Sequence, residues 1–65
     1  LAAIRKIEEK KGLQWLPDKL YEMALARINN PEDGLAELGE QMDPPLKKSG
    51  VNHRLKKIEE MAEKL

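Results

Sequence analysis

A stripe of apolar residues near the end of the chain constrains its fold more than any other feature. Its members recur at intervals of four, three, four and three residues: Val51, Leu55, Ile58, Ala62 and Leu65. This spacing places all five on one side of an α-helix, whereas a half-buried strand would alternate apolar and polar residues. The stripe therefore predicts one long amphipathic helix over residues 48–65 with this side buried.

Two further helices are predicted in the first half of the chain, over residues 1–11 and 18–29. The first ends at Gly12, because glycine suits the positive-φ position that follows a helix. Asn29-Asn30-Pro31 stops the second. Trp15 lies between these helices and is interpreted as a core residue. No segment shows the alternation or the β-branched enrichment of a strand.

A short third helix is predicted after Asp33, which we interpret as its N-cap. Its inward residues are expected to be Leu35, Leu38 and Met42. Ala36 and Gly39 are small enough to let another helix come close. The segment Asp43-Pro44-Pro45 then breaks the chain, because each proline lacks an amide donor and disfavours helix in the residue before it.

Together these segments predict a small all-α domain of four helices. Helices three and four would form a helix-turn-helix over about residues 33–64. Ala36 and Val51 are 15 residues apart in the sequence, so the turn is longer than the compact turn of about 3–4 residues. We therefore expect an extended, proline-containing turn.

Chain length and cysteine content limit the kinds of protein this can be. The 65 residues suffice for a single domain near the lower limit of unaided folding. Because the sequence starts at Leu1 inside a predicted helix, we expect it to be the C-terminal fragment of a longer protein. Without cysteines, neither a disulfide nor a thiolate metal site can form. No apolar run is long enough to predict a membrane span.

The charge distribution favours nucleic acid although the formal net charge is zero. Residues 1–43 carry six basic and nine acidic side chains, whereas residues 44–65 carry six basic and three acidic. Within residues 44–58 the charged side chains are all basic: Lys47, Lys48, Arg54, Lys56 and Lys57. DNA responds to the local field at its phosphates, so a basic stretch on a neutral domain is sufficient.

The exposed side of the last predicted helix has the character of a recognition helix, whose N-terminal residues contact base edges. The predicted groove contacts are Ser49, Asn52, His53 and Lys56. The predicted phosphate contacts are Lys47, Lys48, Arg54, Lys57 and the amides near Gly50. Arg54 could equally reach a base. From periodicity and charge alone, a merely solvated face remains the alternative.

The sequence does not predict an enzyme. Ser49 is the only serine, no threonine is present, and His53 is the sole histidine. This histidine is predicted on an exposed face without an acid to orient it, as a nucleophilic triad requires. A second histidine and a cysteine are both absent, so no metal site is predicted, and no cofactor is expected.

The segments Leu35–Glu40 (LAELGE) and Lys48–Leu55 (KSGVNHRL) resemble the C-terminal domain of the bacterial WhiA family. Gly12-Leu13 and Leu16-Pro17 also resemble this family, so the resemblance covers most of the chain. It implies a helix-turn-helix domain that binds double-stranded DNA in a sequence-specific manner. It also implies an N-terminal domain similar to LAGLIDADG homing endonucleases but without nuclease activity.

The resemblance further implies a transcription regulator that acts in sporulation, cell division and chromosome segregation. Such a protein would be cytoplasmic and associated with the nucleoid. The alternative is a helical protein-interaction module whose last helix docks an acidic partner such as RNA polymerase. A nuclease is a more distant alternative.

Overall fold

The computed structural model describes residues 2–42 and 44–65. Its elements, in chain order, are α1 (Ala2–Lys10), the 3-10 helix η1 (Leu13–Trp15), α2 (Asp18–Asn29), α3 (Leu35–Glu40) and α4 (Lys48–Glu63). Throughout these two ranges the backbone forms helices and turns and no strand. The prediction of a small all-α domain of four α-helices is confirmed.

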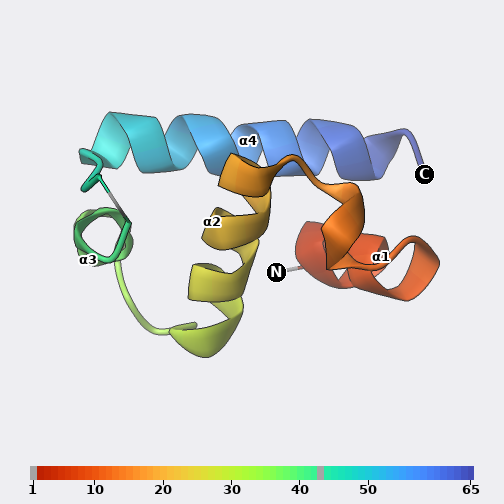
Figure 1. The fold of residues 1–65 in the computed structure, drawn as a ribbon, viewed down its shortest axis with the longest axis horizontal. Helices are drawn as coiled ribbons and strands as arrows, with labels where there is room; N and C mark the ends of the chain where they lie inside the picture. The colour runs from red at the N-terminus through yellow and green to blue at the C-terminus, as the bar shows by residue number, and fades with distance from the viewer. Residues whose placement is uncertain (1, 43) are drawn as a thin grey trace.

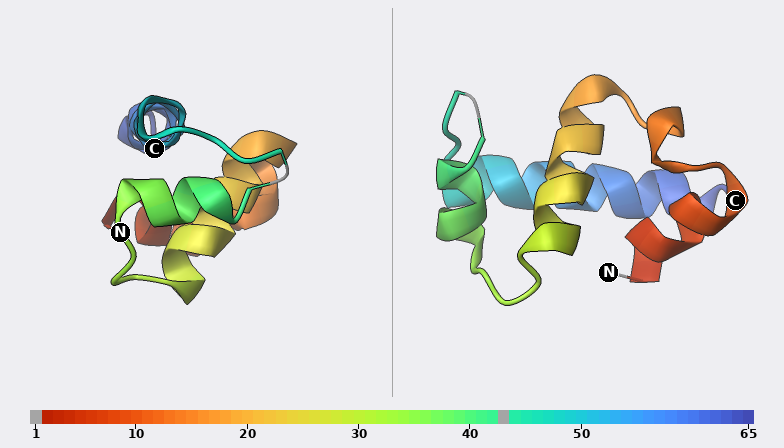
Figure 2. Two further views of the ribbon diagram at one scale, coloured as in Figure 1. Left: turned by 90° about the vertical axis from the view of Figure 1, so that its left-hand side faces the viewer. Right: turned by 60° about the horizontal axis from the view of Figure 1, so that its bottom comes forward.

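The long helix α4 organises the domain. Helices α1, α2 and α3 each pack against α4, and Figure 1 shows all three beneath it. In Figure 2, the view along α4 again places the other helices on one side of it. The opposite side of α4 is therefore left to solvent along its whole length.

The core lies where the three lower helices meet α4. Its largest fully buried side chains are Ile7, Met23, Leu38, Val51 and Ile58. The predicted stripe of α4 is confirmed at Val51, Ile58 and Ala62, which are buried. Leu55 and Leu65 are only partly buried. Leu55 borders an open groove between α1, α2 and α4, so the described residues leave one side of it uncovered.

Two residues predicted in the core lie at the surface instead. Trp15 is 38% exposed, because the three-residue turn η1 buries Leu13 and leaves the tryptophan outside. Leu35 is 36% exposed. It is the first residue of a six-residue helix that buries Leu38 and Gly39. Both predictions were wrong.

The breaks between helices follow the predicted signals with one correction. Gly12 has a φ of 84°, and its amide donates to the Ile7 carbonyl at 2.9 Å, which ends α1. Asn30 closes α2, its backbone amide donating to the Ala26 carbonyl at 3.0 Å. The predicted N-cap of α3 was wrong: Gly34 occupies that position, and no side chain caps the helix.

The third helix is also shorter than predicted. It ends at Glu40, and the next two residues form turns in which the Gln41 and Met42 amides donate to carbonyls three residues earlier. Leu1, where the first helix was predicted to begin, and Asp43, the first residue of the predicted break, lie outside the described residues.

Candidate nucleic-acid interface

The first turn of α4 presents backbone amides without helical partners. The first helical hydrogen bond runs from the Val51 amide to the Lys47 carbonyl at 3.1 Å. Lys47 is the N-cap, and no side chain caps the helix. The amides of Lys48, Ser49 and Gly50 therefore lie at the positive end of a 16-residue helix, where an anionic group is stabilised.

The outer side of α4 carries most of the predicted contact residues. Seven of them are exposed: Lys47, Lys48, Ser49, Asn52, His53, Lys56 and Lys57. Five of them, namely Ser49, Asn52, His53, Lys56 and Lys57, occupy helical positions at least a quarter turn from the buried Val51, and Lys47 and Lys48 stand at the start of the helix. Figure 1 shows that α1, α2 and α3 all lie on one side of α4. The fold thus brings these seven residues onto one continuous surface.

The other two predicted contacts, Gly50 and Arg54, are only partly exposed. A Cβ built on Gly50 would come 3.5 Å from Cδ2 of Leu46. The missing side chain of Gly50 thus faces the preceding turn rather than solvent. Gly50 can take part in an interface through its backbone amide, and Arg54 from the flank of the exposed face.

Acidic residues are kept away from this surface along the helix. Glu59, Glu60 and Glu63 occupy the second half of α4 and are exposed. The first half of the helix, through Lys57, carries basic charge only. One end of α4 is therefore attractive to phosphate and the other is repulsive, which orients the helix on a polyanion.

The turn between α3 and α4 is closed by contacts around Gly39. The Gly39 carbonyl accepts hydrogen bonds from the Leu46 amide at 2.9 Å and from the Met42 amide at 3.2 Å. A Cβ on Gly39 would collide with the Leu46 carbonyl oxygen and would lie 3.1 Å from Cγ2 of Val51. Only glycine lets the proline-containing turn fold back this closely, and the turn delivers Lys47 to the start of α4.

The small size of Gly39 was evident from the sequence, but its contact with Leu46 was not. The signal was incomplete, because a lone glycine in a helix indicates a close approach without saying which backbone approaches. In the structure, the approaching groups are the turn and α4 together. Helix α3 is seen end-on in Figure 1 while α4 runs across the view, so the two helices are crossed.

A second group of side chains, missed by sequence analysis, holds the connection between α2 and α3. Asn30 Nδ2 donates to Gln41 Oε1 at 2.8 Å, and Gln41 Nε2 donates to Asp33 Oδ2 at 2.7 Å. Arg27 Nη1 donates to the Pro31 carbonyl at 2.9 Å. These residues are polar and lie at helix ends and in turns, so their sequence shows no periodicity from which the pairing could be inferred.

The described residues show neither a metal-binding cluster nor a helix suited to cross a membrane. Within the two described ranges, no group of histidine, cysteine, aspartate or glutamate side chains is arranged to hold a metal ion. His53 and Ser49 are both exposed on α4. None of the helices in the described part of the chain has the length and hydropathy needed to cross a membrane.

A crossed pair of helices with an exposed, basic second helix defines a helix-turn-helix domain, the class of fold with which many regulators bind DNA. Comparison with known families agrees. The family described as "WhiA C-terminal HTH domain" matches residues 1–62. The chain belongs to the WhiA family.

Curated relatives carry the same family name. A "Probable cell division protein WhiA" from Clostridium beijerinckii is 53% identical over 70 residues, which covers 98% of this chain and 22% of the relative. Proteins of that name from Clostridium novyi and Natranaerobius thermophilus are 52% and 53% identical, covering 100% and 95% of this chain. The matched region makes up 20% of the first of these two proteins and 19% of the second. No solved structure gives a significant match.

Proposed function

We propose that this domain binds double-stranded DNA in a sequence-specific manner through the first half of α4. The observation that carries the proposal is the exposed surface from Lys47 to Lys57. It combines basic side chains, base-reading side chains and uncapped helix amides. A recognition helix needs all three, since phosphates position the protein and base edges specify the site.

The two kinds of contact are assigned by position and chemistry. Ser49, Asn52, His53 and Lys56 enter the major groove, where amide, imidazole and ammonium groups can donate to base edges. The backbone contacts come from Lys47, Lys48, Arg54, Lys57 and the amide of Gly50. Arg54 stands at the flank of the exposed face and also reaches a base if the helix tilts toward it.

At the scale of the whole protein, the domain is the C-terminal part of a longer transcription regulator. The chain spans about a fifth of the length of the relatives described above, and the matching family is described as a C-terminal domain. An N-terminal domain similar to LAGLIDADG endonucleases, without nuclease activity, accounts for the remaining length. The protein acts in cell division, sporulation and chromosome segregation, at the nucleoid in the cytoplasm.

The domain contributes binding and no catalysis. The reactive side chains that the described residues offer, Ser49 and His53, both stand on the open face of α4. A nucleophile and its base act within hydrogen-bond reach of an orienting group in a sheltered site. These two side chains serve better as donors to DNA than as a catalytic pair.

Selection of bound duplexes from a random pool by the 65-residue domain tests the proposal. We expect recovery of one enriched motif, and loss of that enrichment in Asn52→Ala, with Glu60→Ala as the matched control on the acidic half of α4. Recovery of random sequence alone would contradict sequence-specific binding. Retention of the domain by RNA polymerase, without binding to any duplex, would favour the protein-interaction alternative.

A further inference from the structure

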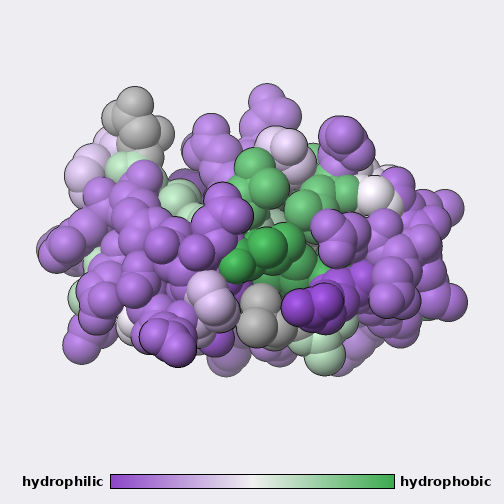
Figure 3. Space-filling model, turned by 90° about the horizontal axis from the view of Figure 1, so that it is seen from below, coloured by the Kyte–Doolittle hydropathy of each residue, from purple (hydrophilic) through white to green (hydrophobic). Residues whose placement is uncertain are grey.

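An apolar groove lies beneath α4, on the side of the domain that carries the core rather than the basic surface. It has a volume of about 500 Å³ and lies between α1, α2 and α4. Figure 3 shows hydrophobic surface gathered at the centre of the face beneath α4. Exposed apolar surface gathered in one place is a candidate interaction site on a small domain.

The side chains of the groove are arranged to receive a helix. Its floor includes Ala3, Ile4 and Ala62, and alanines allow a neighbouring helix axis to approach to within about 8–10 Å. Leu55 borders the groove and is only partly buried. Its open side provides the apolar contact that a packed helix would cover.

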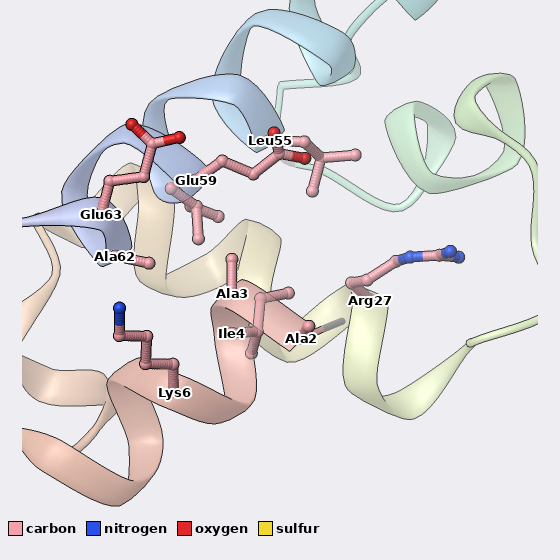
Figure 4. Close-up of a pocket in the computed structure, with 10 residues that line it drawn as sticks. Ala2, Ala3, Ile4, Lys6, Arg27, Leu55, Glu59, Ala62 and Glu63 are labelled. Carbon is pink, nitrogen blue, oxygen red and sulfur yellow. The ribbon is translucent and has the colours of Figure 1, made fainter. Parts of the chain in front are cut away.

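The polar groups of the groove lie at its rim. Figure 4 shows Arg27 on one side and Glu59 and Glu63 on the other, with Lys6 below. A small-molecule site would instead have a few polar groups converging inside the cavity. Rim charges of both signs suit a peptide segment with an apolar face and charged flanks.

The first turn of α1 forms one wall of this groove, through Ala2, Ala3 and Ile4. Figure 4 shows these residues at the start of the helix, facing Leu55 of α4. A chain that leads into α1 therefore enters the domain beside the groove. In relatives about five times as long, most of the protein precedes a domain described as C-terminal.

We propose that the chain leading into α1 continues this helix backwards and packs into the groove, covering Leu55. This inference rests on the proposed position of the domain at the end of a longer protein. It is independent of how α4 contacts DNA. The groove is lined by α4 residues from Leu55 to Glu63, whereas the basic surface begins at Lys47. The packed segment therefore leaves the first turn of α4 free.

Thiol labelling at position 55 tests the packing directly. The 65-residue domain has no cysteine, so Leu55→Cys introduces a single reporter there. In the full-length protein, mass spectrometry of the peptide that contains residue 55 reads the same site. We expect labelling to be about tenfold slower or more in the full-length protein than in the domain, because the segment must open first.

Glu60→Cys is the matched control, since residue 60 is exposed on the same helix outside the groove. Its labelling should be equal in both proteins, and circular dichroism should show that both variants stay folded. Equal labelling of the Leu55→Cys thiol in the two proteins would overturn the proposal. Slow labelling of the domain that speeds up on dilution would also overturn it and would assign the groove to a second copy.

A native protein whose chain begins at Leu1, shown by its intact mass, would overturn the inference as well. Duplex binding is measured separately on the same samples. If the thiol at position 55 is not protected from labelling in the full-length protein while DNA binding is intact, only the groove proposal is contradicted. Protection without DNA binding contradicts only the proposed function.

Discussion

At the scale of single residues, the proposed interface divides between side chains that read base edges and side chains that contact phosphates. Asn52 is exposed one turn into α4 and offers a paired donor and acceptor, which suits an adenine edge. Lys48 is exposed at the helix start, where a flexible ammonium suits a phosphate better than a base. The two residues should therefore respond differently to substitution.

Asn52→Ala should weaken binding to the preferred duplex by about 1–3 kcal/mol and leave random duplexes nearly unaffected. Lys48→Ala should weaken both alike, because phosphates are the same in every sequence. Fluorescence anisotropy with matched duplexes measures both, after thermal melts show that the variants are folded. Equal loss on every duplex in folded Asn52→Ala would reassign base reading toward Arg54.

Two glycines of the helix-turn-helix should respond in opposite ways to alanine. Gly39→Ala collides with the Leu46 carbonyl and should cost about 1–3 kcal/mol, as overpacking does. Gly50→Ala meets only the Leu46 side chain at 3.5 Å and gains up to about 1 kcal/mol of helix propensity. Thermal melting should show Tm falling in the first variant and holding or rising in the second.

Each kcal/mol corresponds to roughly 4–8 °C in Tm for a domain of this size. The predicted difference between the two variants is therefore well above the error of a melting curve. An unchanged Tm in Gly39→Ala would show that the turn does not fold back onto α3 as described.

At the scale of elements, apolar periodicity predicted where the helices lie. It predicted less well how far each apolar side chain is buried. The stripe of α4 identified the buried Val51 and Ile58, because a helix in a small domain has one side on the core. Periodicity does not say how far neighbouring helices extend over that side. Leu35 and Leu55 fit the pattern and remain partly or largely uncovered for this reason.

The ends of the helices were harder to predict than their positions, because they depend on local hydrogen bonds that the apolar pattern does not encode. Asp33 looked like the N-cap of α3, yet its carboxylate accepts a hydrogen bond from Gln41 instead. That bond joins the two ends of α3. The contact face of α4 was predicted as a set of nine residues, of which seven are exposed and Gly50 and Arg54 are partly buried. Their contacts with DNA remain predictions.

The side-chain hydrogen bonds from Asn30 to Gln41 and from Gln41 to Asp33 predict that a second substitution can restore stability lost through a first. Gln41→Glu places a second carboxylate against Asp33 and should destabilise the domain by about 1 kcal/mol, the value of one lost hydrogen bond. Asp33→Asn alone should change little, since its amide oxygen still accepts from Gln41. The double variant should recover stability, because the amide introduced at position 33 then donates to the carboxylate introduced at position 41.

Urea unfolding of the four proteins measures this coupling. If the two substitutions change the free energy of unfolding additively, the side chains at positions 33 and 41 do not interact in solution. Raising the salt concentration should weaken the effect of Gln41→Glu, since repulsion between exposed charges is screened.

At the scale of the whole molecule, the two sides of α4 differ in their surroundings and charge. The inner side holds α1, α2 and α3 and borders the groove, and the outer side carries the basic surface. A formal net charge of zero conceals this separation. Binding to a polyanion depends on the basic half of α4 and not on the sum of charges.

The salt dependence of duplex binding tests the central claim, that the first half of α4 meets DNA, most directly. Log affinity of the 65-residue domain should fall with log salt at about −0.9 per phosphate contact, giving a slope of roughly −3 to −5 from about 50 mM salt upward. Lys48→Ala should reduce the slope by about one, while the exposed Lys64 at the far end of α4 should be replaceable by alanine without effect. A slope near zero, or no duplex binding at low salt, would contradict the account.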